Sequence, residues 1–176
     1  MTHRITTPLT PDTVRALRAG DEVRITGVIY TARDAAHKKL CELLAEENPL
    51  PVDLRNQIIY YTGPTPAPPG RPIGSCGPTT SYRMDRYTPA LLRQGLRGLI
   101  GKGRRAPEVI DALREHTAVY FAAEGGCGAL LANYVKTCEV VAFPELGTEA
   151  IHRLEVEDFP VSVFCDSRGD QYSPYL

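Results

Sequence analysis

The sequence predicts an α/β fold in which a layered sheet carries flanking helices, and three observations support this class. Downstream of residue 79, stretches typical of strands alternate with stretches typical of helices of about ten residues. The first third of the chain is richer in strands and loops. Hydrophobic residues make up 43% of the chain and charged residues 23%, as in proteins that bury a core. Because no repeat or linker interrupts the pattern, residues 1–176 are expected to form a single domain.

The first third is expected to begin with a short helix. Thr10 can cap this helix, Pro11 can be its first residue, and it should end before Gly20. A strand is then expected over 23–30, a helix over 33–46 and a second strand over 57–62. Residues 63–72 contain five prolines, which exclude regular structure and predict a loop.

The remainder of the chain follows the alternating pattern. A helix is expected to begin near Thr79, because Pro78 has a backbone dihedral suited to a first helical turn. Thr88 and Pro89 open a further helix that should end near Gly95. Such alternation predicts a buried and partly parallel sheet. The other expected elements are strands over 96–100, 118–123, 140–143 and 161–165, and helices over 107–116 and 126–135.

Composition argues against several classes of protein. No apolar run approaches the ~20 residues of a membrane-spanning helix, and the first residues lack the apolar stretch of a secretory signal. We therefore expect a cytoplasmic protein with no membrane partner. The net charge is −1 and no basic motif is interleaved with aromatic residues, which argues against a nucleic-acid partner.

The cysteines do not form a recognisable metal or disulfide motif. There are five of them, and none belongs to a C-x-x-C pair. The odd number argues against a disulfide framework, and the wide spacing argues against a zinc or iron–sulfur site held by this chain alone. We therefore expect no metal ligand in this chain. The cysteines are Cys41, Cys76, Cys127, Cys138 and Cys165.

Residues 74–85 form the most informative segment and read Gly-Ser-Cys-Gly-Pro-Thr-Thr-Ser-Tyr-Arg-Met-Asp. On the predicted helix, the hydroxyls of Thr79 and Thr80 would lie at the first turn, where free N–H groups favour an anion. Arg83 lies one turn further on and could bind a carboxylate or phosphate through two parallel hydrogen bonds. Residues 83–105 contain seven cations against Asp85 alone, which predicts either a solvated basic face or the wall of a site for a small dianion.

Other interpretations of this segment remain open from the residues alone. A capped helix with a surface arginine is a common local feature. A stand-alone module that binds small anions or nucleotides without catalysis would also use these hydroxyls and the basic stretch. Lys102 stands between two glycines after a predicted strand, but Gly-Lys-Gly alone is weak evidence because turns also use glycine.

Segment 77–85 resembles the signature of the C-terminal domain of class I fumarate hydratases and of the related β subunit of L-tartrate dehydratase, which are iron–sulfur hydro-lyases. Three further segments are similar to motifs of that family, and all four occur in the family order between residues 33 and 170. The likeness therefore covers nearly the whole chain. The further segments are Arg33-Asp34-Ala35-Ala36-His37-Lys38, Ile100-Gly101-Lys102-Gly103, and 154–160 followed by Asp166 and Gly169.

The resemblance implies the swivelling β/β/α fold and a role in the reversible hydration of fumarate to L-malate. It implies that Arg33, Thr80, Arg83 and Lys102 bind the C4 dicarboxylate substrate, and that Thr79 is the candidate base. In the family, the [4Fe-4S] cluster is held by a domain that this chain lacks. The resemblance thus implies a β subunit that is inactive without a cluster-bearing α subunit, in an α2β2 heterotetramer.

The β subunit of L-tartrate dehydratase is the alternative within the family, because the chemistry of the two reactions is the same. Asp85 and the segments around 154–160 and 166–169 make the chain look more similar to the fumarate enzymes.

Two other groups of polar residues have structural interpretations. His37 follows Arg33 by one turn but has no second histidine or acidic partner at ligand spacing, so we expect a hydrogen-bonded structural histidine. Glu155, Glu157 and Asp158 precede a proline, and we expect them to form a solvated turn rather than a catalytic pair.

Overall fold

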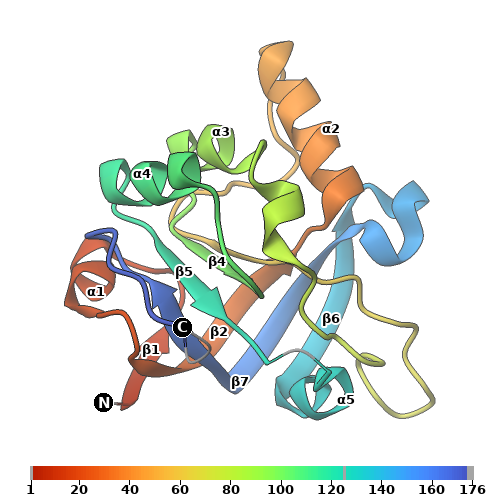
Figure 1. Cartoon of the computed structure of the whole chain (residues 1–176). Coiled ribbons are helices and arrows are strands. Elements are labelled where there is room, and N and C mark those ends of the chain that lie inside the picture. The colour runs from red at the N-terminus through yellow and green to blue at the C-terminus, as the bar shows by residue number, and fades with distance from the viewer. Residues whose placement is uncertain (1, 125, 174–176) are drawn as a thin grey trace.

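The structure is a computed structural model that describes residues 2–124 and 126–173. Within these residues one sheet contains seven strands, in the order β1-β2-β3-β4-β5-β7-β6, with an additional pairing of β2 with β7 (Figure 1). The strands are β1 (Thr2–Thr6), β2 (Glu22–Thr31), β3 (Ile58–Tyr60), β4 (Gly98–Gly101), β5 (Val119–Ala122), β6 (Val135–Ala142) and β7 (Ile151–Cys165).

The additional pairing closes the sheet into a barrel. Strands β2, β3, β4, β5 and β7 each pair with two neighbours of this set, whereas β1 extends the sheet beside β2 and β6 beside β7. Pairs from β1 to β5 are parallel, and every pairing of β7 is antiparallel. The predicted mixed α/β fold with a partly parallel sheet and a strand-rich first third is confirmed.

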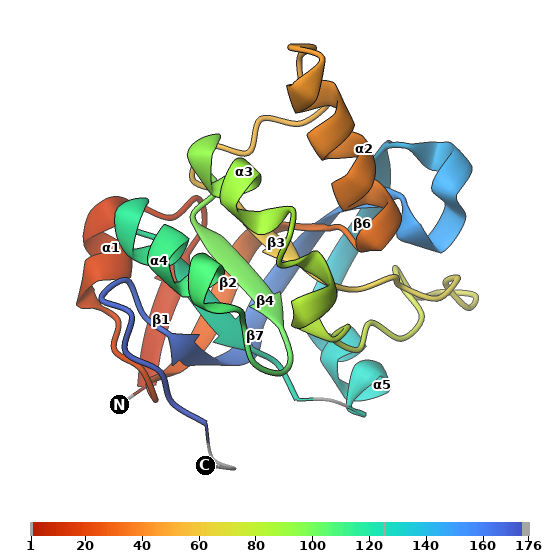
Figure 2. The same cartoon turned by 45° about the horizontal axis from the view of Figure 1, so that its top comes forward.

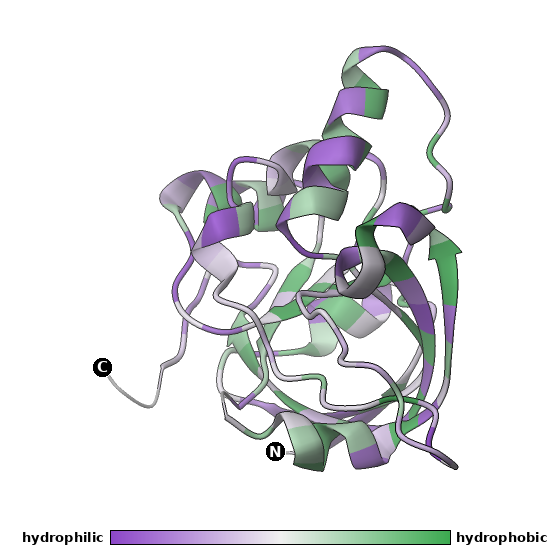
Figure 3. Cartoon of the chain, turned by 90° about the vertical axis from the view of Figure 1, so that its right-hand side faces the viewer, coloured by the Kyte–Doolittle hydropathy of each residue, from purple (hydrophilic) through white to green (hydrophobic). Residues whose placement is uncertain are grey.

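Alternation along the strands separates two apolar clusters. Ile58 and Tyr60 of β3 face the barrel interior, whereas Ile59 and Tyr61 face the helices on the outside. Figure 3 shows that hydrophobic residues are frequent along the strands, with hydrophilic residues interspersed. Both faces of β3–β5 are therefore buried, as expected for parallel strands.

The helices that cover the outer cluster gather on one side of the barrel (Figure 2). They are α2 (Asp34–Ala45), α3 (Thr88–Arg93) and α4 (Pro107–Glu115). Helix α1 (Pro11–Ala16) and the short α5 (Gly128–Leu131) contribute Val14 and Leu131 to the interior cluster. The 3₁₀ helices are η1 (Ser81–Met84), η2 (Ala132–Tyr134) and η3 (Pro144–Glu149).

The helices predicted after Thr10, over 33–46 and over 107–116 correspond to α1, α2 and α4. The cap at Thr10 is present, since its hydroxyl accepts a hydrogen bond from the Thr13 N–H at 3.1 Å. Residues 63–72 contain no helix or strand, as their prolines predict.

Other elements differ from the predictions. Strand β1 was not expected, because Ile5 is its one buried residue and the run is short and polar. The helix predicted over 126–135 is confined to α5 and η2, since the chain turns into β6 at Val135, five residues before the predicted strand. Tertiary pairing with β7 overrides the local pattern here.

The acidic run before Pro160 was predicted as a solvated turn, and this was wrong. These residues lie inside β7, where the register to β2 shifts between Ile25 and Gly27. Asp158 has φ 53 and its N–H donates to the Thr26 hydroxyl at 3.0 Å. One extra residue on β7 forms a bulge there, and the strand continues through it.

Among the described residues, no helix is both long and apolar enough to cross a membrane.

The barrel interior yields a test of the strand assignment for β7. Phe159 is fully buried and contacts Tyr60 and Tyr134 edge-on, with ring centroids 5.4 and 6.4 Å away. Phe159→Ala should lower the free energy of unfolding by about 3–5 kcal/mol in urea denaturation, because it leaves a cavity. The matched control Glu157→Ala, at an exposed position of the same strand, should change it by less than about 0.5 kcal/mol. Equal effects would contradict the assigned register.

Candidate functional site

The candidate site lies at the carboxyl edge of three parallel strands. Strands β2, β3 and β4 run in the same direction, so the segments that follow them meet at one edge. The Ala32 N–H donates to the Tyr60 carbonyl at 3.1 Å, and the Tyr61 N–H donates to the Ile100 carbonyl at 2.8 Å. These bonds extend the pairing past the strand ends and hold the three segments side by side. In α/β folds with parallel strands, both open and closed, the carboxyl edge of the strands is a common place for ligand binding.

Segment 77–80 runs along this edge as non-helical, paired chain, which corrects the predicted helix from Thr79. The Thr79 N–H donates to the Tyr61 carbonyl at 2.6 Å, and the Ser81 N–H donates to the Lys102 carbonyl at 2.9 Å. Thr80 and Lys102 form an isolated parallel bridge. The first helical residue is Ser81, and it begins a 3₁₀ turn. No helix N-terminus with free N–H groups exists at Thr79, because the edge of the sheet pairs with this segment.

Thr79, Thr80 and Lys102 thus come together through backbone pairing. All three are partly exposed, so their side chains remain accessible. Among the described residues, Lys102 has no ion-pair partner. A lysine without an ion-pair partner among the described residues therefore pairs through its backbone with the segment that carries the two threonines.

Arg33 and Arg83 meet at the carboxylate of Asp34. Arg33 lies two residues after β2 and caps α2, whereas Arg83 lies in η1. The Nη2 atom of Arg33 lies 3.9 Å from Asp34 Oδ2, and the Nη2 atom of Arg83 forms an ion pair with the same oxygen. The two predicted arginines, fifty residues apart in the chain, are therefore linked by one side chain.

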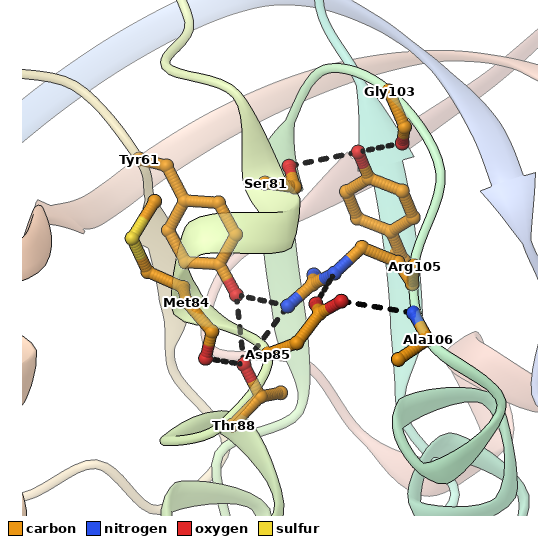
Figure 4. Close-up of polar contacts among 9 residues, drawn as sticks. Tyr61, Ser81, Met84, Asp85, Thr88, Gly103, Arg105 and Ala106 are labelled. Atoms are coloured by element: carbon orange, nitrogen blue, oxygen red, sulfur yellow. Dashed lines mark hydrogen bonds and ion pairs between the residues drawn. The ribbon is translucent and has the colours of Figure 1, made fainter.

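Figure 4 shows an ion pair between the buried Arg105 and the partly buried Asp85, close to Ser81 and Gly103. The Arg105 side chain has no exposed surface, and its Nε donates to Asp85 Oδ1 at 2.7 Å. Its Nη2 donates to the hydroxyls of Tyr61 and Thr88 at 3.0 and 2.9 Å. Asp85 Oδ2 also accepts from the Ala106 N–H at 2.9 Å, at the start of α4. The pair locks the segment carrying Arg83 to the segment carrying Lys102.

Two aromatic rings make the buried charge of Arg105 tolerable. The guanidinium lies 5.1 Å from the ring centroid of Tyr61 and 4.8 Å from that of Tyr120. Burial disfavours the charged form, but the two tyrosines and Asp85 more than offset this, so the pKa of Arg105 is raised.

Tyr120 supports the glycine turn around Lys102. Its hydroxyl lies 2.7 Å from the Gly103 carbonyl, to which it donates, and 2.8 Å from Ser81 Oγ. Because the tyrosine has one proton, the Ser81 hydroxyl must donate in return. Gly101 is required beside this contact, since a Cβ there would lie 2.0 Å from Ser81 Oγ. Gly101 therefore serves close packing of segment 77–81 against β4.

His37 is structural, as predicted, but one of its ring nitrogens lacks a partner. Its Nδ1 lies 2.8 Å from the Arg33 carbonyl, and its backbone N–H donates to the same oxygen at 3.0 Å. The ring packs against Tyr61 and Tyr87, and Nε2 is buried without a hydrogen bond. Burial lowers the pKa of His37 to about 4, so the ring is neutral near pH 7.

The described residues do not fit a metal cluster. No three His, Cys, Asp or Glu side chains gather as metal ligands among residues 2–124 and 126–173. Cys76 and Cys165 are buried thiols, and burial raises the pKa of each to about 12, which opposes the thiolate form that iron requires.

Sequence reasoning missed the residues that organise the site. Asp34 stands beside Arg33 in the chain, and that adjacency was the available signal. Asp85 was taken only as a mark of likeness, and Arg105 only as part of a basic stretch. Nothing local indicates that these two residues, twenty positions apart, form a buried pair.

Asp166 of the C-terminal motif also has a structural role. Its carboxylate accepts hydrogen bonds from the backbone N–H groups of Ala19, Arg168 and Asp170, at 3.0, 2.9 and 3.1 Å. These hydrogen bonds connect the turn after β7 to the segment that follows α1.

The motif order agrees with a comparison against protein-family models, which matches residues 2–173 to the family described as "Fumarase C-terminus". The chain belongs to this family.

Several relatives of this chain are named as enzymes or enzyme subunits. The anaerobic class I fumarate hydratase of Escherichia coli K12 is 43% identical over 150 residues, which cover 84% of this chain and 27% of that protein. "Fumarate hydratase 2" of Leishmania major is 41% identical over 160 residues, or 89% of this chain and 28% of that protein. "Putative L(+)-tartrate dehydratase subunit beta" of Methanocaldococcus jannaschii is 42% identical over 168 residues, or 92% of this chain and 86% of that protein. This chain thus spans only about a quarter of the fumarate hydratases but most of the subunit.

The buried ion pair generates a stability prediction. Asp85→Ala should lower the free energy of unfolding by about 3–5 kcal/mol, because it leaves the Arg105 guanidinium buried without its carboxylate. Asp12→Ala, which removes an exposed ion pair to Arg15, should change it little. Urea denaturation of both variants is the measurement. A similar small effect at Asp85 would mean that Arg105 is not held as described.

The buried imidazole generates a pH prediction. The unfolded chain binds a proton at His37 below its ordinary pKa of 6.5, whereas the folded chain does so only near 4. Stability is therefore lost as the pH falls through this window, by about 2 kcal/mol between pH 7 and pH 5 from this residue. His37→Asn, which can still donate to the Arg33 carbonyl, should show a correspondingly smaller loss. His116→Gln, at a partly exposed position, should keep the wild-type dependence in urea titrations at both pH values.

Proposed function

We propose that this chain is the β subunit of a two-chain hydro-lyase that interconverts fumarate and L-malate. The observation that supports this proposal is that the segments carrying Arg33, Arg83 and Lys102 lie at one edge of the sheet with the segment carrying Thr79 and Thr80. Three cations beside two hydroxyls suit a small dianion. The names of the relatives support the choice of reaction.

The cations would act by binding charge that grows during the reaction. Removing a proton from the carbon next to a carboxylate spreads negative charge onto that carboxylate. Donors placed at this group bind the transition state more tightly than the substrate, and this difference accelerates the chemical step. Arg33 and Arg83 can each present a planar pair of N–H groups, and Lys102 a point charge.

Thr79 is the proposed proton acceptor, with Thr80 beside it as a substrate ligand. A threonine hydroxyl is a very weak base, so the role requires nearby positive charge that lowers its pKa. The backbone bonds of Thr79 and Ser81 fix this segment against Tyr61 and Lys102. The charge of Lys102 is therefore held next to the hydroxyl-bearing segment.

We assign the [4Fe-4S] cluster to an α subunit, because the described residues of this chain do not fit such a group. The proposed assembly is an α2β2 heterotetramer. In it, this chain contributes carboxylate binding and proton transfer, and the partner completes the site.

The β subunit of L-tartrate dehydratase is the second candidate, and one observation favours it. The Methanocaldococcus relative bears that name and is matched over 86% of its length. The anion-binding module has lost its main support, because the helix start on which it depended is extended and paired chain.

Anaerobic co-expression with a candidate α subunit tests the proposal. Each chain alone should be inactive, and the purified complex should convert L-malate to fumarate. Faster dehydration of L-tartrate would instead support the second candidate. Failure to form a complex with an α chain that carries an intact cluster would contradict the proposal.

A paired substitution tests the assigned ligands. Arg83→Lys should lower kcat/KM of the complex about 100-fold, because a planar donor pair becomes a point charge. Arg86→Lys is the matched control, since Arg86 is an exposed neighbour that stacks on Tyr87, with its Cζ 4.6 Å from the ring centroid. Its kcat/KM should stay within about twofold of wild type. Equal rates for all three proteins would remove Arg83 from the site.

A further inference from the structure

Asp34 is the feature from which a further inference follows. Its Oδ2 atom contacts Nη2 of both Arg33 and Arg83, and no other described carboxylate contacts either arginine. The contact joins the first turn of α2 to η1. Because Arg33 and Arg83 belong to separate elements, their relative position depends on this side chain.

The contact engages the two guanidinium groups unequally. Nη2 of Arg83 donates to Asp34 Oδ2, whereas Nη2 of Arg33 lies 3.9 Å from this oxygen, beyond hydrogen-bond distance. The Nε atom of Arg33 is buried without a hydrogen-bond partner among the described residues. The Arg33 side chain is 28% exposed and that of Arg83 is 44% exposed, so both can still reach a ligand. Asp34 therefore lies near the Nη2 atom of each arginine and leaves part of both side chains exposed.

The remainder of Arg33 is fixed by other contacts. Its carbonyl accepts from both the ring Nδ1 and the backbone N–H of His37. A Cβ on Gly63 would lie 3.1 Å from Arg33 Cδ, so the stem lies in a narrow space against the chain. The head group of Arg83 has no comparable support, and Asp34 is its ion-pair partner. Arg83 should thus be the arginine that depends most on Asp34.

Asp34 also balances charge at the site. Two arginines that approach one point repel each other, and a shared carboxylate offsets this repulsion. Three cations (Arg33, Arg83, Lys102) and one carboxylate leave two positive charges among these residues. This matches the two negative charges of a C4 dicarboxylate.

We propose that Asp34 is a positioning residue that holds Arg33 and Arg83 in a convergent arrangement for one substrate carboxylate. This inference rests on the proposed function and deepens it. Asp34 acts through the arginines and does not touch the reacting atoms.

A double-mutant cycle in the two-chain complex tests the catalytic part. Asp34→Asn keeps the shape of the side chain and removes its charge, and it should lower kcat/KM about tenfold in the wild-type background. In the Arg83→Lys background the same change should cost less than about threefold, because its effect passes through Arg83. Additive effects would overturn the proposal.

The matched control for this cycle is Glu145→Gln. It removes the exposed ion pair of Glu145 with Lys39, which also lies on α2, and it should leave kcat/KM unchanged in both backgrounds. An equal loss in this variant would mean that α2 docking, and not the arginine pair, is being measured.

A second measurement separates this inference from the proposed reaction. In the purified chain, ¹⁵N relaxation of the arginine Nε–H groups, with Arg83→Lys used for assignment, should show an ordered Arg83 that becomes mobile in Asp34→Asn. Unchanged order would overturn the positioning role whatever the enzyme does. If Arg83 is ordered by Asp34 but the wild-type complex is inactive, the result would contradict the proposed reaction and leave the positioning role of Asp34 standing.

Discussion

The buried pair of Arg105 and Asp85 is the interaction on which the candidate site depends. It joins the segment that carries Arg83 to the turn that carries Lys102, and neither segment has regular structure long enough to hold itself. A buried ion pair is a costly way to join two loops, because both charges lose water. Here the cation–π contacts of two tyrosine rings, and hydrogen bonds to the hydroxyls of Tyr61 and Thr88, stabilise the buried guanidinium.

The barrel explains why the remaining parts meet there. Parallel β2, β3 and β4 deliver three chain segments to the same edge, and segment 77–81 pairs with that edge as an additional extended stretch. Backbone hydrogen bonds therefore place Thr79, Thr80 and Lys102, whereas a side-chain carboxylate links Arg33 and Arg83. These contacts bring the segments that carry three cationic side chains to one edge of the sheet. Such an edge suits a chain that contributes one half of a site and a partner that contributes the other half.

The fold class and most helices and strands follow from the sequence, because alternating apolar patterns and proline positions are local signals. The bulge at Asp158 and the extended segment at Thr79 do not, because pairing with distant strands decides both. The candidate ligands were named from motif resemblance, and their roles stay predictions. The sequence could not indicate the contacts of Asp34 with the two arginines or the ion pair of Arg105 with Asp85. These contacts join segments that lie together only in the folded barrel.

Hydrogen–deuterium exchange of the two-chain complex, with and without saturating L-malate, tests most directly whether this chain binds a C4 dicarboxylate. We expect slower exchange on ligand binding in three segments of this chain, around 33–37, 77–83 and 101–105, with little change in β6. Protection confined to the partner chain, or to β6 and the far end of the barrel, would contradict it.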